Sequence, residues 1–463
     1  MEEKSEEKIM ASINNKASNV NVSKELSVYE KLCRSVMCNL LWEDEFYEDG
    51  KSNTMRIREY MKSVTKEEAL SVLYESKFSN KLRHVPLFLI VQMVKRGIIT
   101  SDEISNIITR VDDMSELISL YKNEEGNKAT MIPHCITKGI AKAFPKFDEY
   151  QLAKYKGDKK AISLKDVIKV ARPKPINKEQ EELWKKVVEN KLSTPDTWDV
   201  ELSKSKDKKE SWTRLLKEKN SKGYSKIGSL ALLRNIRNII ESGVDIDILK
   251  DAINNMDISH ILPYQFITAN RYGKSVSKEL EEKFFSCTKE MDKLTGSTVV
   301  LIDASGSMHS PLSRNSKTTR VDAASSLAAI AKEISEDVTV YSFNQKAKEI
   351  PQSFRGFALC KSIKAIGCTA AIDSTYYAIK RFRKLHNGRY PSRVIVITDE
   401  QTNADLRNSS FENLPKCCNG YLINVASYEE GIKYSTSSNW TTINGWSENI
   451  LKYISVCEKE KKN

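Results

Sequence analysis

Apolar residues recur at helical spacing from Val28 to about Lys293. In the stretch KLCRSVMCNLLW, for example, Leu32, Val36 and Leu40 fall on one face of a helix. Glycine and proline stand between such stretches, where they interrupt a helix least. The spacing predicts many consecutive helices joined by short connections, an arrangement typical of stacked helix pairs. No clean repeat period is visible, so we expect the repeats to be degenerate.

Local signals place some of the boundaries. TSDEISNIITRV opens with Ser101 followed by acidic residues, which predicts the start of a helix there. The stretch from Pro173 to about Lys222 holds three prolines and the charge run KSKDKKE. It predicts a short helix around Trp184 followed by a charged loop. Residues 1–27 carry few large apolar side chains and predict a disordered arm.

The pattern changes at Thr295 and Gly296. Short apolar runs rich in Val, Ile and Tyr now alternate with amphipathic stretches. The runs predict strands at 297–303, 338–343, 393–399 and 421–427, and the stretches between and after them predict helices at 321–335, 372–385 and 446–456. Strands that alternate with helices indicate a parallel, doubly wound sheet covered on both faces.

Composition agrees with a chain of several domains. At 463 residues the protein is too long for one hydrophobic core. No apolar run approaches the roughly 20 residues of a membrane span, and the polar N-terminus does not resemble a secretory signal. The nine cysteines show no CxxC pair and no zinc-ligand spacing. These features favour reduced thiols and a cytoplasmic location.

The net charge of +12 is unevenly concentrated. Residues 131–175 hold 11 Lys or Arg and four Asp or Glu. Such a segment is a candidate footprint for a polyanion such as RNA, and a solvated helical face explains the charge equally well. Among its tyrosines, Tyr150 and Tyr155 could stack against bases, although tyrosines in helical repeats more often belong to the core.

The segment LIDASGSM places Asp303, Ser305 and Ser307 where a predicted strand ends. A nucleophile site, a phosphate loop, a metal site and a plain polar turn all use such residues. The stretch lacks a GxSxG elbow, and the chain lacks a GxxxxGK[ST] phosphate loop. Hydroxyl and carboxylate oxygens suit a hard cation such as Mg²⁺, which favours the metal site over the polar turn.

The pattern DxSxS resembles the metal-ion-dependent adhesion site of von Willebrand factor A domains. In that motif a threonine from a second loop and an aspartate from a third complete the site, and Thr369 and Asp399 match them here. The resemblance implies that Ser305, Ser307 and Thr369 touch Mg²⁺ or another divalent cation. Asp303 and Asp399 would act directly or through water. Ala370 departs from the family, which often has an acidic or amide residue there.

The helical part resembles the TROVE module of the Ro autoantigen family, in which that module precedes a von Willebrand factor A domain. The similar segments are Leu40–Gly50, Lys81–Leu89, Gln151–Pro175, Leu230–Asn238 and Ile258–Gly273. The resemblance implies a HEAT-like ring of helical repeats at 28–294 and a Rossmann-like α/β domain at 295–463. It also implies binding of misfolded RNA and of small non-coding, Y-like RNA.

Candidate RNA-binding residues follow from the same resemblance. In the basic segment they are Lys138, Lys142, Lys154, Lys156, Lys165, Lys169 and Arg172. Leu164 departs from the family, which has a histidine at that position. Arg234 and His260 also match family positions, but a helix-surface or interhelical ion pair would explain Arg234, and a buried turn would explain His260. The resemblance also makes Tyr264 a candidate for stacking on a base.

The sequence is compatible with three kinds of function. The first is a non-catalytic RNA-binding scaffold, monomeric in its ribonucleoprotein, that attaches a ribonuclease or another protein through the metal site. The second is a metal-dependent protein-interaction module without RNA, or a scaffold for phage or host assembly. The third, a nuclease, would need clustered carboxylates around two metal ions, whereas the candidate site offers two carboxylates around one ion. We therefore expect no enzymatic activity and no membrane association.

Overall fold

The computed structural model describes residues 27–38, 50–126, 131–155, 161–220, 223–312, 318–363, 370–399, 414–425, 439–444, 447 and 449–460. The predicted arm at 1–27 lies outside these residues except for Ser27, and so do residues 40–49 of the TROVE-like segment Leu40–Gly50. The chain forms two compact units. One comprises residues 57–211, and the other comprises residues 1–56 together with 212–463.

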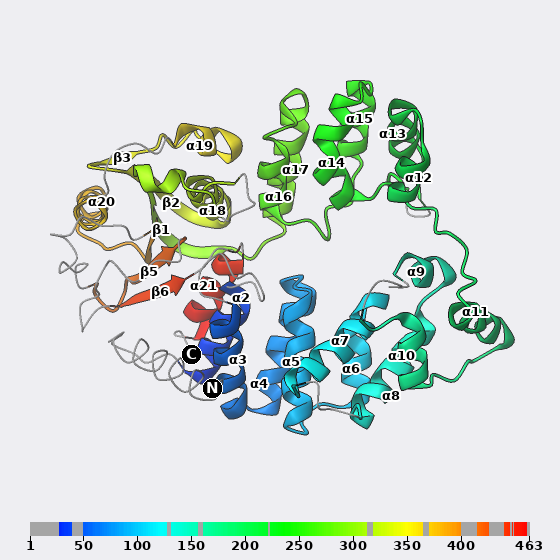
Figure 1. Cartoon of the computed structure of the whole chain (residues 1–463). Helices are drawn as coiled ribbons and strands as arrows, with labels where there is room; N and C mark the ends of the chain where they lie inside the picture. The colour runs from blue at the N-terminus through cyan, green and yellow to red at the C-terminus, as the bar shows by residue number, and fades with distance from the viewer. Residues whose placement is uncertain are drawn as a thin grey trace. The chain divides into compact units, whose positions relative to one another are not determined.

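The described part of the unit at 57–211 is built from helices (Figure 1). Its first helix, α3, already begins at Gly50, and its last, α13, continues to Lys217. The elements are α3 (Gly50–Ser63), α4 (Lys66–Tyr74), η1 (Glu75–Ser79), α5 (His84–Lys95), α6 (Ser101–Ile107), α7 (Val111–Glu124), α8 (His134–Ala143), η2 (Phe144–Lys146), α9 (Glu149–Lys154), α10 (Leu164–Ala171), α11 (Lys178–Val188), α12 (Trp198–Lys204) and α13 (Lys208–Lys217).

Helix α5 is apolar on nearly every side, because its neighbours surround it. Residues Val85 to Met93 are all buried. It packs against α4 and α7. Several of these helices begin with a reciprocal cap, in which a hydroxyl and a carboxylate satisfy two exposed backbone N–H groups. In α6 the cap is Thr100 with Glu103, one residue before the predicted Ser101.

The charged stretch after Trp184 is more ordered than its composition predicts. The helix around Trp184 is confirmed as α11. The predicted loop that follows instead contains α12 and α13, so that prediction is wrong. The reason is that Trp212, Leu215 and Leu216 are buried, and their helical spacing supplies an apolar face that the surrounding lysines obscure.

The other unit begins with α2 (Val28–Cys38) and resumes after α13 with more helices. These are α14 (Ser229–Glu241), α15 (Ile246–Asn254), α16 (Pro263–Ala269), η3 (Lys274–Val276) and α17 (Ser277–Lys289). The α/β part follows directly. It contributes β1 (Leu294–Asp303), η4 (Gly306–His309), α18 (Arg320–Ile334), β2 (Ser335–Phe343), β3 (Ala347–Glu349), α19 (Gly356–Ser362), α20 (Ala371–Leu385), β4 (Arg393–Thr398), β5 (Asn419–Asn424), β6 (Trp440–Asn444) and α21 (Asn449–Glu460).

The six strands form one sheet in the order β3-β2-β1-β4-β5-β6. All neighbours are parallel except β3, which pairs antiparallel with β2 at the edge. Helical repeats followed by a doubly wound α/β domain were predicted, and that fold class is confirmed. The sequence did not predict β3, β6 or α19, which are short or lack a clear apolar run.

Helices cover the sheet because its strands are apolar on both faces. One face, which includes Val299, Leu301 and Val396, packs against Ala378 and Phe382 of α20. Helix α18 also contacts β1 and β2, and α21 packs against α2. This arrangement brings the carboxyl ends of β1 and β4 together, since the two strands are adjacent and parallel. No described helix has the length and apolarity needed to cross a membrane.

Candidate metal centre and nucleic-acid interface

The first candidate site lies where β1 and β4 end. Asp303 closes β1 and is fully buried. Its carboxylate accepts a hydrogen bond of 2.5 Å from the Thr398 hydroxyl and one of 2.8 Å from the backbone N–H of Ser305. Burial raises the pKa of Asp303 to about 6, and the nearby charge of Asp399 adds to the rise, whereas these hydrogen bonds oppose it.

Two hydroxyls stand beside this carboxylate. The Ser305 and Ser307 oxygens are 3.1 Å apart, and the short helix η4 begins directly after Ser305. Ser305 is the N-cap of η4 and Ser307 lies in its first turn, and this change from extended to helical backbone leaves the two hydroxyls within hydrogen-bonding distance. Asp399, also fully buried, follows β4 directly and is close enough to Asp303 to perturb its ionisation.

Asp399 has a positively charged partner that the sequence did not indicate. The Arg320 guanidinium, at the first residue of α18, donates a hydrogen bond of 2.9 Å to one Asp399 oxygen. The side chains of Arg320 and Asp399 are 11% and 0% exposed, so this ion pair is largely withdrawn from water. Arginine at this place already neutralises one of the two carboxylates.

The oxygen donors of Asp303, Ser305 and Ser307 fit a single hard cation, and a buried carboxylate with a raised pKa gains from a nearby positive charge. Asp399 can contribute its other oxygen or act through water while Arg320 holds the first. Thr369, the expected ligand from the second loop, lies outside the described residues.

The second candidate site is the basic segment at 131–175. Helix α10 presents Lys165 and Lys169, one turn apart, on its exposed side. Arg172 is exposed as well, and it caps the end of the helix in a left-handed conformation with a φ of 49°. Within the described residues, none of the three forms an ion pair. The opposite face, including Leu164, is buried. Leu164 is 3% exposed, so a side chain at this position contributes to packing and is not available to a ligand.

Lys154, at the end of α9, lies among aromatic rings. Its ammonium is 5.9 Å from the ring centre of Tyr150 and 5.5 Å from that of Tyr155. The Arg110 guanidinium stands 4.9 Å from the Tyr155 ring and is also paired with Asp112. Tyr150 is 46% exposed. Exposed aromatic faces beside cations are the components from which single-stranded nucleic acid sites are built.

The other predicted cations differ in their surroundings. Lys138 and Lys142 are exposed on α8, and Lys142 is paired with Asp102 at 2.6 Å. Pairing and the nearby lysines lower the pKa of Asp102. Such an exposed pair is weak and can open to a competing phosphate. Lys156 lies outside the described residues.

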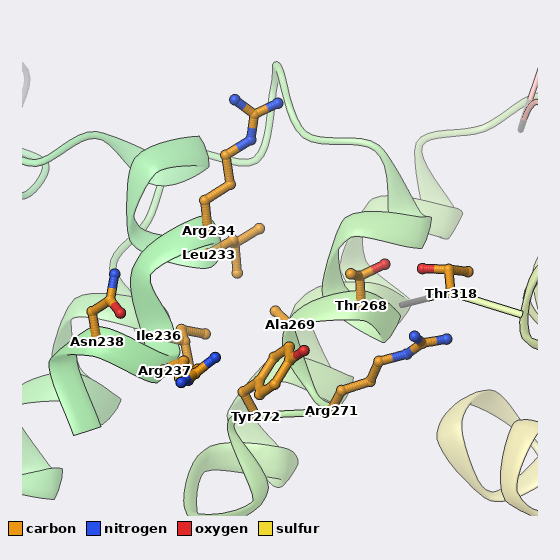
Figure 2. A pocket seen from close by; sticks show the side chains of 10 residues that line it. All are labelled: Leu233, Arg234, Ile236, Arg237, Asn238, Thr268, Ala269, Arg271, Tyr272 and Thr318. Carbon is orange, nitrogen blue, oxygen red and sulfur yellow. The ribbon is translucent and has the colours of Figure 1, made fainter. Parts of the chain in front are cut away.

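Arg234 lines a cavity of about 460 Å³ in the unit that contains the sheet. Figure 2 shows α14 and α16 facing each other across it, with Arg234, Arg237, Arg271 and Tyr272 among the labelled side chains. No acidic residue lines it. Among the described residues Arg234 forms no ion pair, so neither the helix-surface pair nor the interhelical pair that would have explained it is observed.

Each of the other two arginines of the cavity already forms an ion pair. Arg237 pairs with Glu241 at 2.8 Å and stands 5.8 Å from the Tyr272 ring centre. Arg271 pairs with Asp322 of α18 at 2.6 Å. His260 lies apart from the cavity lining, on the turn before α16, where it is exposed. The buried turn considered for His260 is therefore wrong.

Sequence reasoning missed Arg320, Arg110 and Arg271, although each contacts a candidate site. Their contacts lie far along the chain or across helices, and a local pattern cannot show such contacts. Arg320 stands at the start of a predicted helix next to the site in space, which is the one signal that could have indicated it. Tyr264, whose hydroxyl bonds to Thr318 at 3.2 Å, is used within the fold.

Comparison with known proteins agrees with this architecture. The crystal structure of the Deinococcus radiodurans Ro (RSR) protein superposes with a TM-score of 0.61, covering 93% of this chain and 99% of that chain at 13% identity. At that identity the likeness establishes the fold. None of the curated proteins matches the chain. The TROVE domain model matches residues 52–191 and 185–323. Because these segments cover more than half of its length, the chain belongs to the TROVE domain family.

Proposed function

We propose that the protein is a non-catalytic RNA-binding scaffold that holds small non-coding or misfolded RNA by its helical repeats. The observation that carries this proposal is the cluster of Lys154, Tyr150, Tyr155 and Arg110, inside the first TROVE-matched segment. A cation close to two aromatic rings offers a phosphate and a base their preferred partners within a few ångströms of each other.

The face of α10 extends the same cationic surface. Lys165, Lys169 and Arg172 are exposed, and neighbouring helices α7 and α8 pack against α10. Each cation that meets a phosphate displaces a condensed counterion, so affinity falls steeply as salt rises. Because Leu164 is buried, this surface would recognise RNA by charge and stacking, without the histidine that other family members have there.

The cavity lined by Arg234 supports the proposal in the other unit. Arg234 has its guanidinium available to an anion, and no carboxylate lines the cavity to repel one. Tyr272 is 42% exposed and could accept a stacked base. The cavity lies within the second TROVE-matched segment, so each matched segment has its own arrangement of arginine or lysine with tyrosine.

The cation site has a different role in this proposal. Asp303, Ser305 and Ser307, with Thr369 and Asp399, would hold Mg²⁺ or a similar divalent cation. The cation would leave a coordination position to which a partner protein can supply a carboxylate. We therefore assign this site to attachment of a second protein. A two-metal nuclease is not favoured, since the described residues contain no group of three or more His, Cys, Asp or Glu able to hold a metal.

RNA binding by the helical repeats can be tested with a labelled RNA hairpin that carries a single-stranded tail. The variant Lys154→Ala with Lys169→Ala removes two exposed cations of the proposed surface. Its matched control, Lys62→Ala with Lys66→Ala, removes two cations elsewhere in the same unit, both paired with glutamates. Affinities are measured over a series of salt concentrations.

We expect the test variant to bind more weakly and to show a smaller salt slope, by roughly 1.4, because each phosphate contact on a single strand contributes about 0.7. The control should retain the wild-type slope, because neither of its lysines belongs to the proposed surface. No RNA binding by the wild type at low salt would refute the proposal. Equal slopes for the two variants would place the RNA on another surface.

A further inference from the structure

A second cationic surface lies on the α/β part, outside the TROVE-matched segments. Between Ser374 and Thr398 the sequence contains six Lys or Arg and no Asp or Glu. Helix α20 and the turn after it carry most of them. One face of α20, with Ala378, Ile379 and Phe382, is buried against the sheet. The opposite face of α20 is exposed and holds most of its charged side chains.

The exposed residues of α20 follow helical spacing and therefore form a stripe. Asp373 and Leu385 are among the exposed residues of this helix. The cationic and aromatic ones are Tyr376, Tyr377, Lys380, Arg381 and Lys384, and Arg389 follows in the turn. We call these six residues the α20 stripe. Asp373, one turn before the first tyrosine, is the nearest exposed carboxylate on the same helix. The stripe itself is uniformly cationic and aromatic.

Few of these cations are neutralised. Arg381 pairs with Glu349 of β3 at 2.8 Å. Among the residues that the structure describes, Lys380, Lys384 and Arg389 form no ion pair. Unpaired cations along one helix face repel each other, and nothing in the packing of α20 requires them, because its buried face is apolar. Such an arrangement is stabilised when an anion binds to it.

The aromatic side chains set this surface apart from a simple solvated face. Tyr376 is 51% exposed and Tyr377 is 48% exposed. The Lys380 ammonium is 5.9 Å from the Tyr376 ring centre, so the ring and the cation are presented together. At the far end, the Arg383 guanidinium stands 4.3 Å from the Tyr390 ring. The same pairing of ring and cation occurs around Lys154 in the helical repeats.

We propose that the α20 stripe binds single-stranded RNA. Lysine ammonium groups would meet successive phosphates, and the rings of Tyr376 and Tyr377 would stack on bases. An acidic peptide would satisfy the cations but would leave two half-exposed tyrosines without a role. The stripe would give the protein a contact for RNA made by residues other than those proposed in the helical repeats and in the cation site.

Two sets of substitutions distinguish the parts of this surface. Lys380→Ala with Lys384→Ala removes charge, and Tyr376→Ala with Tyr377→Ala removes stacking. All four side chains are exposed, so the fold should tolerate their loss. The matched control is Lys278→Ala with Lys289→Ala on α17, which removes two exposed lysines from the same unit. Thermal unfolding of each full-length variant verifies that it is folded.

The probe is a fluorescein-labelled oligouridylate of twelve nucleotides, and a poly-glutamate peptide of similar charge serves as the comparison ligand. We expect the lysine variant to reduce the salt slope by about 1.4, and the tyrosine variant to weaken binding about fivefold or more. The control should change neither quantity. Ultraviolet crosslinking of the wild type should attach uridine to the peptide that contains Tyr376 and Tyr377.

The two RNA proposals can be separated by a second titration. In it, Lys154→Ala and Lys169→Ala are added to the wild type and to each α20 variant. If the helical repeats do not bind RNA, those two changes have no effect while the α20 variants still do. Binding of RNA that is unchanged in both α20 variants, with no crosslink on α20, would overturn the assignment. A second result would also overturn it. If the lysine variant loses poly-glutamate binding and the tyrosine variant binds RNA as the wild type does, the partner is an acidic protein.

Discussion

Replacing Arg320 by methionine would show whether its guanidinium stands in for a cation at the candidate metal site. Methionine retains much of the apolar stem and removes the charge. In the wild type the guanidinium lies 2.9 Å from an Asp399 oxygen, and the Asp399 side chain has no exposure to water. In the variant, the buried Asp399 carboxylate therefore loses the arginine charge while it remains close to the buried Asp303 carboxylate.

The cost can be estimated from the burial of the pair. Removing one partner of a buried ion pair typically destabilises a protein by about 3–5 kcal/mol, because the remaining charge loses its compensating charge where water does not reach it. A divalent cation bound by Asp303 and its neighbours would offset this charge. If it binds only the folded protein, it adds about 2.7 kcal/mol of stability when its concentration is 100 times its dissociation constant.

We therefore expect Arg320→Met to lower the free energy of unfolding markedly in EDTA and to recover much of the loss in Mg²⁺. The wild type should gain less from Mg²⁺, because Arg320 already compensates Asp399. The assay is thermal or urea unfolding of the full chain over a series of Mg²⁺ concentrations. The signal should come from the α/β part, for example from amide hydrogen exchange in β1 and β4, because the six tryptophans of the chain do not report on that part alone.

Arg271→Met is the matched control. Arg271 pairs with Asp322, which lies two residues after Arg320 on α18, but the side chains of Arg271 and Asp322 are 25% and 39% exposed. Loss of such a pair should cost only about 0–1 kcal/mol and leave the response to Mg²⁺ unchanged. If Arg320→Met and Arg271→Met behave alike, or if Mg²⁺ stabilises Arg320→Met no more than the wild type, the reasoning about the buried pair is wrong.

Two further substitutions test neighbouring parts of the structure. Asp303→Ala should abolish stabilisation by Mg²⁺ while leaving RNA affinity nearly unchanged, measured by unfolding and by hairpin titration; a large loss of RNA affinity would show that the sites are coupled. Gly420→Ala on β5 should lower the unfolding temperature by several degrees, because the new Cβ would lie 2.3 Å from the buried Trp440 ring. A melting curve equal to that of the wild type would contradict the close contact between β5 and β6.

The sequence predicted the α/β part well because its signals are local. Each predicted strand is a short apolar run, and two of these runs end at Asp303 and Asp399. Parallel strands end at the same edge of a sheet, so two such aspartates can be placed together without a structure. The helical part was predictable as helices for the same reason, since its apolar spacing persists through most of the stretch.

What the sequence could not predict depends on distant partners or on weak local signals. The three residues of β3 are recognisable only because β2 pairs with them. Arg320 has an ordinary helical context, and its importance comes from Asp399, 79 residues further along the chain. The charged stretch that forms α12 and α13 resembles a loop in sequence, because its lysines outnumber its few apolar residues, of which Trp212 is one.

In helix α10, burial separates two neighbouring residues that the family resemblance treats as one RNA-binding motif. By sequence alone, Leu164 replaces the histidine of the family and suggests a lost RNA contact, whereas the adjacent Lys165 matches the family. In the helix the two adjacent positions point in different directions, about 100° apart, so one can be buried while the other is exposed. The buried face of α10 therefore limits which substitutions the fold accepts, whereas the exposed face can exchange cations freely. It follows that Lys165 and Lys169 on this exposed face, and the exposed C-cap residue Arg172, remain candidates for RNA contact, and that the absence of a histidine at position 164 does not by itself remove the RNA surface.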